Sequence, residues 1–365
     1  MSAINPTKPL RLRPSVSIVP SSDPHIWEFF QGNTRRVVRI KLAEPSSIEP
    51  FLSLSGTSLY DLQSRYGDAT LPKLAGFLFE KCCIEYLDTG QAIEENRRYR
   101  VLQFLGDYFP SSEVFGSFNR IRNSRIAVVG VGAVGSWVAS GLAQIGVKSL
   151  ILIDSDVVEK SNLNRSYYTL RDVGLPKVHQ LAKNIRSLDS DIAPIYRRAS
   201  IGSLDDLEKC IGEFEDDLHL VINCADTPSV DFVSSIVSDY CMARGIPHII
   251  AGGYNLHLSL IGPTIVPGMG PCFECIQKAL ENERPEEFEG VRKLERKRRN
   301  IGNLSPINVI SSTFVINDAV RLLCNSARLK PQMIGRRGEY NYLSSEISFT
   351  EFQSLPDCTH CGGTL

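Results

Sequence analysis

From residue 125 onward, short apolar runs of strand length alternate with helical stretches. The runs are rich in β-branched residues and end at glycine, proline or polar residues, which favours buried strands. Strands that alternate with helices in this way are typical of a parallel sheet covered on both faces. We therefore expect an α/β domain with a doubly wound sheet. The predicted strands cover residues 126–129, 150–153, 194–197, 219–226 and 248–251, with a further antiparallel strand at 256–266.

The first part of the chain has a different pattern, in which a hairpin precedes three helices. Two β-rich runs at residues 25–30 and 35–40 flank a short polar turn and predict the hairpin. Of the helical stretches that follow, the second runs from Ser58 to Gly67, and the third covers residues 71–87. This order predicts a small winged-helix-like α+β domain.

We expect the winged-helix-like domain to cover residues 1–95, with residues 1–15 as a flexible polar arm, and the α/β domain to cover residues 96–365. Winged-helix modules commonly bind DNA, but these helices carry few basic residues for tracking phosphates. The edge of an exposed hairpin can instead bind an extended peptide as an added strand. We interpret the domain as a peptide-binding domain and predict no nucleic-acid partner.

The composition is that of an ordinary globular protein. The chain has 365 residues, of which 42% are hydrophobic and 22% charged, with a net charge of −1. Its uncharged run at residues 126–147 contains glycine, serine and glutamine, so we predict a strand and a helix rather than a membrane span. The N-terminus lacks the apolar core of a signal peptide. Ten cysteines without an export signal favour reduced thiols and a cytoplasmic protein.

A glycine-rich turn follows the first predicted strand of the α/β domain. Gly130, Gly132 and Gly135 have the spacing of nucleotide-binding turns, where they allow a tight turn, close approach of a phosphate and close helix packing. Asp154 ends the next strand and is placed to accept hydrogen bonds from a ribose. The motif indicates a Rossmann-like nucleotide site, and by itself it favours nicotinamide binding.

Two further charged residues lie where α/β domains place their ligands. Lys177 is in the first turn of a helix that begins at Pro176, where it opposes the helix dipole. It is either an exposed surface lysine or the partner of a phosphate. Asp226 ends a predicted strand at the carboxyl edge of the sheet, and its carboxylate suits Mg²⁺.

Two Cys-x-x-Cys pairs are far apart in the sequence. A tetrahedral structural zinc site takes four such thiolates, whereas a redox pair needs only one motif. We predict a closed, non-catalytic Zn²⁺ site that fastens the C-terminal segment to the α/β domain. Its ligands are Cys272, Cys275, Cys358 and Cys361.

The motifs VGVGAVG, DSDVVEKSNLNRS, GLPKV, NCADTP and PCFEC occur in this order. Together they resemble the ThiF/MoeB adenylating enzymes, the bacterial relatives of ubiquitin-activating enzymes, and the resemblance covers residues 96–365. It implies ATP and Mg²⁺ rather than a nicotinamide. The residues it implies are Gly130, Gly132 and Gly135 facing the nucleotide, Asp154 on the ribose with Asp156 nearby, Asn162 and Arg165 on the phosphates, Lys177 as their counter-charge, and Asp226 on Mg²⁺.

The charged segment EENRRYR at residues 94–100 is by composition typical of a solvated linker. In the family that this chain resembles, an arginine from an N-terminal segment reaches the ATP of the partner subunit. The resemblance therefore implies a homodimer and makes Arg98 a catalytic arginine that acts in trans. Because the match is loose by a residue or two, Arg97 and Arg100 remain alternatives.

Two departures from the family pattern narrow the function. The predicted crossover loop, residues 276–305, contains no cysteine that could accept an acyl group as a thioester. The added N-terminal domain is similar to that of the microcin C biosynthetic adenylase and the pantocin-forming enzyme, which modify ribosomally made peptides. The basic run at residues 293–299 is interpreted as a solvated helix face, or else as a loop covering an acidic peptide.

Three functions follow as hypotheses. The first is ATP- and Mg²⁺-dependent adenylation of a carboxylate on a ribosomal precursor peptide, followed by cyclisation, in the biosynthesis of a peptide antibiotic. The second is activation of a small ubiquitin-like carrier protein for sulfur transfer. The third is a leader-peptide-binding scaffold without catalysis, against which the complete set of Asp154, Arg165, Lys177 and Asp226 argues.

Overall fold

The computed structural model describes residues 4–255, 258–282 and 302–362. Its contacts divide the chain into two compact units, Met1–Arg120 and Ile121–Leu365. The predicted basic run at residues 293–299 lies outside the described residues. The two units are described separately below.

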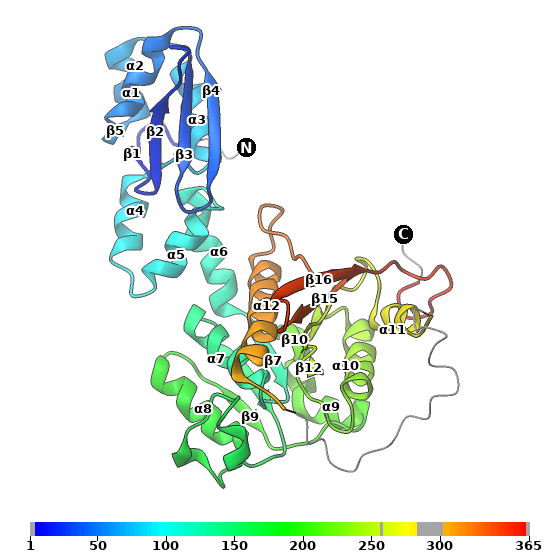
Figure 1. Cartoon of the computed structure of the whole chain (residues 1–365). Coiled ribbons are helices and arrows are strands. Elements are labelled where there is room, and N and C mark those ends of the chain that lie inside the picture. Colours follow the sequence, from blue (N-terminus) through cyan, green and yellow to red (C-terminus); the bar gives the residue numbers. More distant parts are fainter. Residues whose placement is uncertain (1–3, 256–257, 283–301, 363–365) are drawn as a thin grey trace. The chain divides into compact units, whose positions relative to one another are not determined.

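The first unit contains two three-stranded antiparallel sheets and several short helices (Figure 1). In the first sheet β1 is central, and in the second sheet β3 is central. The strands are β1 (Pro9–Leu12), β2 (Val16–Pro20), β3 (Ile26–Gln31), β4 (Arg36–Lys41), β5 (Ser55–Ser58) and β6 (Ile84–Tyr86). The helices are α1 (Glu49–Leu52), α2 (Leu59–Tyr66), α3 (Leu71–Glu80), α4 (Leu87–Glu94), α5 (Tyr99–Gly106) and α6 (Ser111–Asn123), which crosses the unit boundary.

The predicted hairpin is confirmed as β3 and β4, which pair in antiparallel register. The second predicted helix is confirmed as α2. The Ser58 side chain caps its first turn by accepting a hydrogen bond from the Asp61 amide, and Gly67 ends it at φ 65°. Since β2 adds to one side of β3, both β2 and β4 are edge strands of this sheet.

The prediction of a flexible arm over residues 1–15 is wrong for residues 9–12, which form β1. Leu10 is fully buried, and β1 pairs with both β5 and β6. The third predicted helix also ends earlier than expected, at Glu80. Cys82 then takes a left-handed φ of 59° that stops the helix, and the apolar residues after it enter the sheet as β6.

The second unit is built on a six-stranded sheet of order β14-β11-β10-β7-β8-β9. The pairs β11-β10, β10-β7, β7-β8 and β8-β9 are parallel, and β14 is antiparallel at one edge. This confirms the predicted α/β fold with a doubly wound parallel sheet. The strands are β7 (Arg125–Val129), β8 (Ser149–Ile153), β9 (Ile195–Arg197), β10 (Leu218–Asn223), β11 (His248–Ile250) and β14 (Thr264–Ile265).

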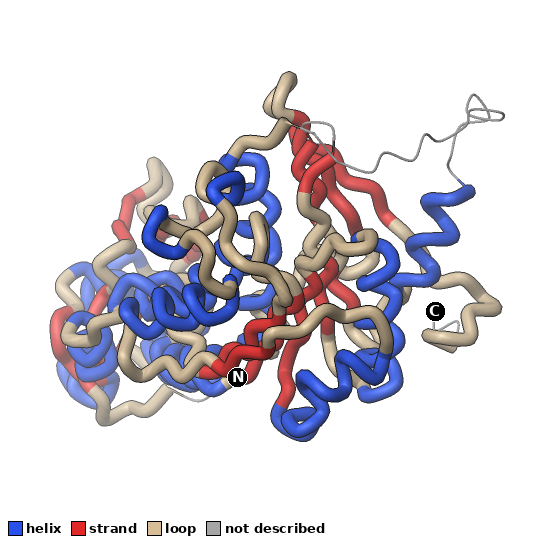
Figure 2. The backbone as a smooth tube through the Cα atoms, turned by 90° about the horizontal axis from the view of Figure 1, so that it is seen from below, coloured by secondary structure: helices blue, strands red, loops and turns tan. Residues whose placement is uncertain are grey.

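Helices cover both faces of this sheet (Figure 2). On one face, α9 (Leu204–Ile211) and α10 (Val230–Arg244) pack on alternate residues of the strands, such as Ala127, Ile151 and Val221. On the other face, α7 (Gly135–Ile145) and α8 (Lys177–Leu188) contact the strands and each other. β7, β8, β10 and β11 are therefore largely buried on both sides, as their apolar sequences predict, whereas the edge strand β9 is partly exposed.

A four-stranded sheet of order β12-β13-β15-β16 completes the second unit. Its strands are β12 (Tyr254–Asn255), β13 (Leu258–Ile261), β15 (Arg336–Asn341) and β16 (Glu346–Glu351), and two more helices are α11 (Phe273–Asn282) and α12 (Ser305–Cys324). Among the described residues, α12 is the one helix long and apolar enough to cross a membrane by length and composition. Half of that stretch is buried, and α12 contacts α7 and β13, so its apolar sequence also suits a core helix.

Candidate active site

The glycine turn between β7 and α7 is closed by backbone contacts. Gly130 has φ 81°, and a Cβ on it would lie 2.6 Å from the amide nitrogen of Ala225. A Cβ on Gly135 would lie 1.9 Å from the Gly130 carbonyl oxygen. A Cβ on Gly132, in contrast, would have no heavy atom within 4 Å. The first and third glycines are therefore needed for packing, whereas the second leaves its backbone accessible.

Alanine substitutions should separate these two roles. Gly135→Ala is expected to lower the free energy of unfolding by about 2 kcal/mol or more. The new methyl group would clash with the Gly130 carbonyl oxygen, which belongs to the backbone and cannot move aside easily. Gly132→Ala should keep a free energy of unfolding within about 0.5 kcal/mol of that of the unsubstituted protein. It should bind ATP more weakly if the nucleotide lies where the sequence predicts it, because the methyl group would occupy open space beside the turn. Denaturant unfolding and ATP titration of both variants check this. Equal stability of the two variants would contradict it.

Asp154 follows β8 and holds the turn from the opposite side. Its carboxylate accepts hydrogen bonds from the amides of Val131 and Asp156, each at 2.8 Å. Burial raises the pKa of Asp154, although the Lys177 ammonium and these amides act in the opposite direction. The Asp154 carboxylate thus fixes both the glycine turn and the segment after β8. Its predicted hydrogen bonds to a ribose stay a prediction.

Lys177 is not an exposed surface lysine, because only 10% of its side chain is exposed. Its ammonium lies 2.7 Å from the Asp156 carboxylate and 3.9 Å from that of Asp154. In this structure its ammonium is therefore paired with carboxylates. The Asp156 side chain is 65% exposed, so this ion pair lies at the solvent-facing side of the Lys177 ammonium.

Arg165 and Asn162 come from the segment between β8 and α8. The Arg165 guanidinium donates to the Asn164 side chain at 3.1 Å and to the Ser161 carbonyl, both of which are neutral. Asn162 accepts a hydrogen bond from the Glu159 amide at 2.9 Å and closes a 3-10 turn, Lys160–Asn162. In this structure Asn162 shapes the segment that carries Arg165.

Asp226 follows β10 at the carboxyl edge of the sheet, next to the strand that leads into the glycine turn. It lines a cavity of about 1030 Å³. This volume is at the upper end of the roughly 300–1,000 Å³ of small-molecule sites. Seven of the predicted residues line this cavity together: Gly130, Gly132, Asp154, Asp156, Arg165, Lys177 and Asp226.

Two predicted residues of the second unit do not line the cavity. Gly135 supports it from behind through its contact with Gly130, and Asn162 belongs to the 3-10 turn. Arg98 lies in the first unit, where it immediately precedes α5. Of the alternatives, Arg97 lies just before Arg98, and Arg100 is the second residue of α5. Their action on the ATP of a partner subunit stays a prediction.

The cavity also contains residues that sequence reasoning did not assign to it. Ser200, Gln277 and Arg337 line it, and no local motif marked them. Cys224 lines it as well, but burial raises the pKa of its thiol far above the usual value. A thiol held neutral is a poor nucleophile, so Cys224 is unsuited to accept an acyl group.

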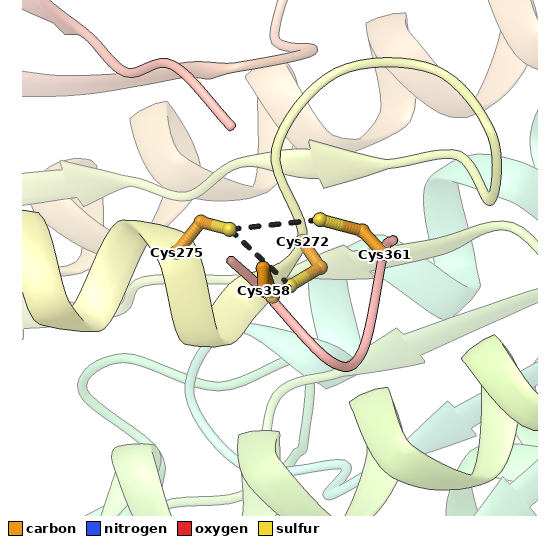
Figure 3. Close-up of side chains that lie close together, drawn as sticks. All are labelled: Cys272, Cys275, Cys358 and Cys361. Carbon is orange, nitrogen blue, oxygen red and sulfur yellow. Dashed lines mark hydrogen bonds between the residues drawn. The ribbon is translucent and has the colours of Figure 1, made fainter. Parts of the chain in front are cut away.

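The four predicted cysteines come together in the second unit (Figure 3). Cys272 and Cys275 lie at the start of α11, and Cys358 and Cys361 lie in the C-terminal segment. The sulfur–sulfur distances are 3.7 Å within the first pair and 3.6 Å for Cys272–Cys358 and Cys275–Cys361. Tetrahedral zinc with Zn–S bonds of about 2.3 Å needs about 3.8 Å, whereas a disulfide needs about 2.05 Å. The cluster is compatible with zinc.

Comparisons with known proteins agree on the second unit. A sequence model described as the ThiF family matches residues 109–361. Ubiquitin-like modifier-activating enzyme 5 of Drosophila ananassae is 26% identical over 248 residues, which cover 66% of this chain and 60% of that protein. The SAMP-activating enzyme E1 of Haloferax volcanii is 27% identical over 247 residues, covering 67% and 82%. The chain thus spans about 60% of the length of the first of these relatives.

Solved structures show the same fold over nearly the whole chain. E. coli MccB, crystallised with ATP, has a TM-score of 0.74 at 20% identity and covers 97% of this chain and 99% of its own. MccB has also been solved in complex with N-formylated MccA, with a TM-score of 0.71. PaaA has a TM-score of 0.63 at 21% identity, covering 80% of this chain and 95% of its own.

Proposed function

The chain belongs to the ThiF family, and we propose that it uses ATP to adenylate a carboxylate on a ribosomally made precursor peptide. The observation that carries this proposal is the cavity at the carboxyl edge of the sheet. The glycine turn, Asp154, Arg165, Lys177 and Asp226 all line it. These residue types suit a triphosphate, because they combine open backbone amides, cations and a carboxylate for a metal ion.

The reaction needs little acid–base help. A carboxylate is already ionised at neutral pH, so one of its oxygens can attack the α-phosphorus of ATP directly. The bond from that phosphorus to the β-phosphate oxygen breaks, and pyrophosphate leaves with the electron pair. The residues around the cavity have to align the groups and offset negative charge, which Arg165 and Lys177 would do.

Mg²⁺ would be held by Asp226 together with oxygens of the substrate. Among the described residues, the cysteine cluster is the only group of three or more His, Cys, Asp or Glu side chains close enough together to hold a metal ion, and Asp226 is not part of such a group. This fits an ion that usually takes one or two carboxylates plus substrate phosphates. When bound, Mg²⁺ would neutralise the charge that develops on the phosphates.

The cysteine cluster would hold a structural Zn²⁺. With all four positions filled by thiolates, no site remains for a reacting group, so the ion would act on stability alone. It would tie the C-terminal segment to α11 across 86 residues of sequence.

The first unit supports a peptide as the substrate. Its sheet β2-β3-β4 has two edge strands and exposes Val19, Phe30 and Val37, so an extended chain could add to an edge beside apolar side chains. We interpret this unit as a winged-helix-like peptide-recognition domain. A homodimer in which Arg98 reaches the partner's ATP belongs to the same proposal.

A second candidate is activation of a small carrier protein, since two curated relatives are named as modifier-activating or SAMP-activating enzymes. The crossover segment without cysteine and the raised pKa of Cys224 disfavour transfer to an enzyme thiol. Both candidate functions can proceed by adenylation without transfer to an enzyme thiol. They differ in the acceptor, which is a precursor peptide in the first and a carrier protein in the second.

ATP–pyrophosphate exchange tests the proposal. The acceptors compared are synthetic peptides from the short reading frames that flank the gene and carrier proteins that end in Gly-Gly. We expect exchange with a peptide and none with the carriers. Exchange with a carrier alone would replace the proposed function by the second candidate. If none of these acceptors supported exchange, that result would contradict adenylation itself.

A further inference from the structure

One wall of the cavity is formed by elements that carry none of the proposed ATP ligands. β13, α11, α12 and β15 contribute the residues of this wall. They include Leu260, Phe273, Leu280, Glu281, Asn308 and Arg337. This second lining of the cavity of about 1030 Å³ combines apolar side chains with uncharged polar ones, one exposed carboxylate on Glu281 and one cation on Arg337.

The sheet order places this wall on the far side of Asp226 from Asp154. Along the carboxyl edge, the strand before Asp154 is followed by β7 with the glycine turn, β10 with Asp226, and then β11. Gly262 packs against the end of β11, since a Cβ on Gly262 would lie only 1.4 Å from the Ile250 carbonyl oxygen. Because β13 and β15 pair Ile261 with Gly338, Gly262 and Arg337 are neighbours. Arg337 thus lies beyond Asp226, on the side away from the predicted ribose position.

The orientation of Arg337 follows from the alternation along β15. The neighbouring Gly338 faces Phe349 and Ile261, and the Arg336 guanidinium lies 3.9 Å from the centre of the Phe349 ring. Arg337 is on the opposite face with Leu260, and both line the cavity. The two adjacent arginines therefore have different surroundings, one stacked on an aromatic ring and one at the cavity.

The Arg337 guanidinium forms only a weak ion pair within the protein. Its Nη2 lies 3.5 Å from the Glu339 carboxylate, and their side chains are 25% and 43% exposed. A single, long, partly exposed ion pair contributes little. A guanidinium has five N–H donors, so Arg337 can bind a further carboxylate in a bidentate way. Lys177, in comparison, is held at 2.7 Å by Asp156.

We propose that Arg337 binds the carboxylate of the acceptor and holds it for attack on the α-phosphorus of ATP. This inference rests on the adenylation proposed above. An anionic acceptor is repelled by the triphosphate, and a cation on the acceptor side offsets that repulsion. One carboxylate oxygen would stay on the Arg337 guanidinium while the other bonds to phosphorus. Pyrophosphate then leaves, and no proton has to move.

The test compares two forms of the acceptor that supports exchange, one with its reactive carboxylate free and one with it converted to a primary amide. Their dissociation constants are measured in the presence of a non-hydrolysable ATP analogue and Mg²⁺. The unsubstituted protein is expected to bind the carboxylate at least 10-fold more tightly than the amide. Arg337→Gln should remove this preference and change the affinity for the ATP analogue less than twofold. Arg337→Lys should keep part of the preference.

Arg336→Lys is the matched control, because it changes the adjacent residue on the other face of β15, and it should keep the full preference. A preference that survives Arg337→Gln would overturn the inference while leaving adenylation intact. The inference would also be overturned if Arg337→Gln kept the preference for the carboxylate but lost affinity for the ATP analogue. That result would assign Arg337 to the phosphates. Failure of the unsubstituted protein to exchange with any acceptor would instead overturn the proposed function, and this inference with it.

Discussion

Asp226→Asn is expected to reduce acceptor-dependent ATP–pyrophosphate exchange by about 100- to 1,000-fold. Asp226 lines the cavity after β10, at the position where a carboxylate can hold Mg²⁺ against the phosphates. Asparagine keeps the shape but removes the negative charge, so it should bind the ion much more weakly. The fold should not change, because Asp226 lies outside the buried core and its replacement leaves the backbone intact.

The dependence on metal concentration separates this role from general damage to the site. The Mg²⁺ concentration for half-maximal exchange should rise in Asp226→Asn, while the thermal unfolding midpoint stays near that of the unsubstituted protein. Asp205→Asn on α9, which also removes an exposed carboxylate of the same unit, serves as the control and should retain full exchange. Full exchange by Asp226→Asn at unchanged Mg²⁺ would remove Asp226 from the proposed magnesium site.

Three of the cavity residues that the sequence predicted share one property. Gly130, Asp154 and Asp226 each come soon after the end of a parallel strand, and the carboxyl ends of such strands meet at one edge. Their proximity in space is therefore a consequence of topology alone. The strands could be read from short apolar runs because a sheet covered on both faces needs them.

The features that the sequence did not predict depend on pairing between distant segments. β1 is a strand because Leu10 pairs with Thr57 and Tyr86, and four residues with the sequence PLRL carry no such information locally. The apolar run that ends in β6 was assigned to a helix because a short apolar run fits either structure. Arg337 reaches the cavity only through the pairing of Ile261 with Gly338, which are 338 − 261 = 77 residues apart.

Cys358→Ser is expected to release the zinc that we propose for the cysteine cluster and to lower the thermal unfolding midpoint by about 10 °C. The purified protein should contain one zinc ion per chain by elemental analysis, and the variant much less than one. The reason is geometric, since Cys358 is 3.6 Å from Cys272 and joins the C-terminal segment to α11. Without the ion, three thiolates and a hydroxyl would have to remain packed together unaided.

Cys324→Ala is the control, because Cys324 is fully buried in the same unit at the end of α12 but lies outside the cluster. It should keep its zinc and lose at most the roughly 1 kcal/mol that removal of one buried sulfur costs. A strong chelator should lower the midpoint of the unsubstituted protein to that of Cys358→Ser and leave the variant unchanged. If the unsubstituted protein holds no zinc, or unfolds at the same temperature with and without it, then hydrogen bonding and packing alone keep the C-terminal segment on α11.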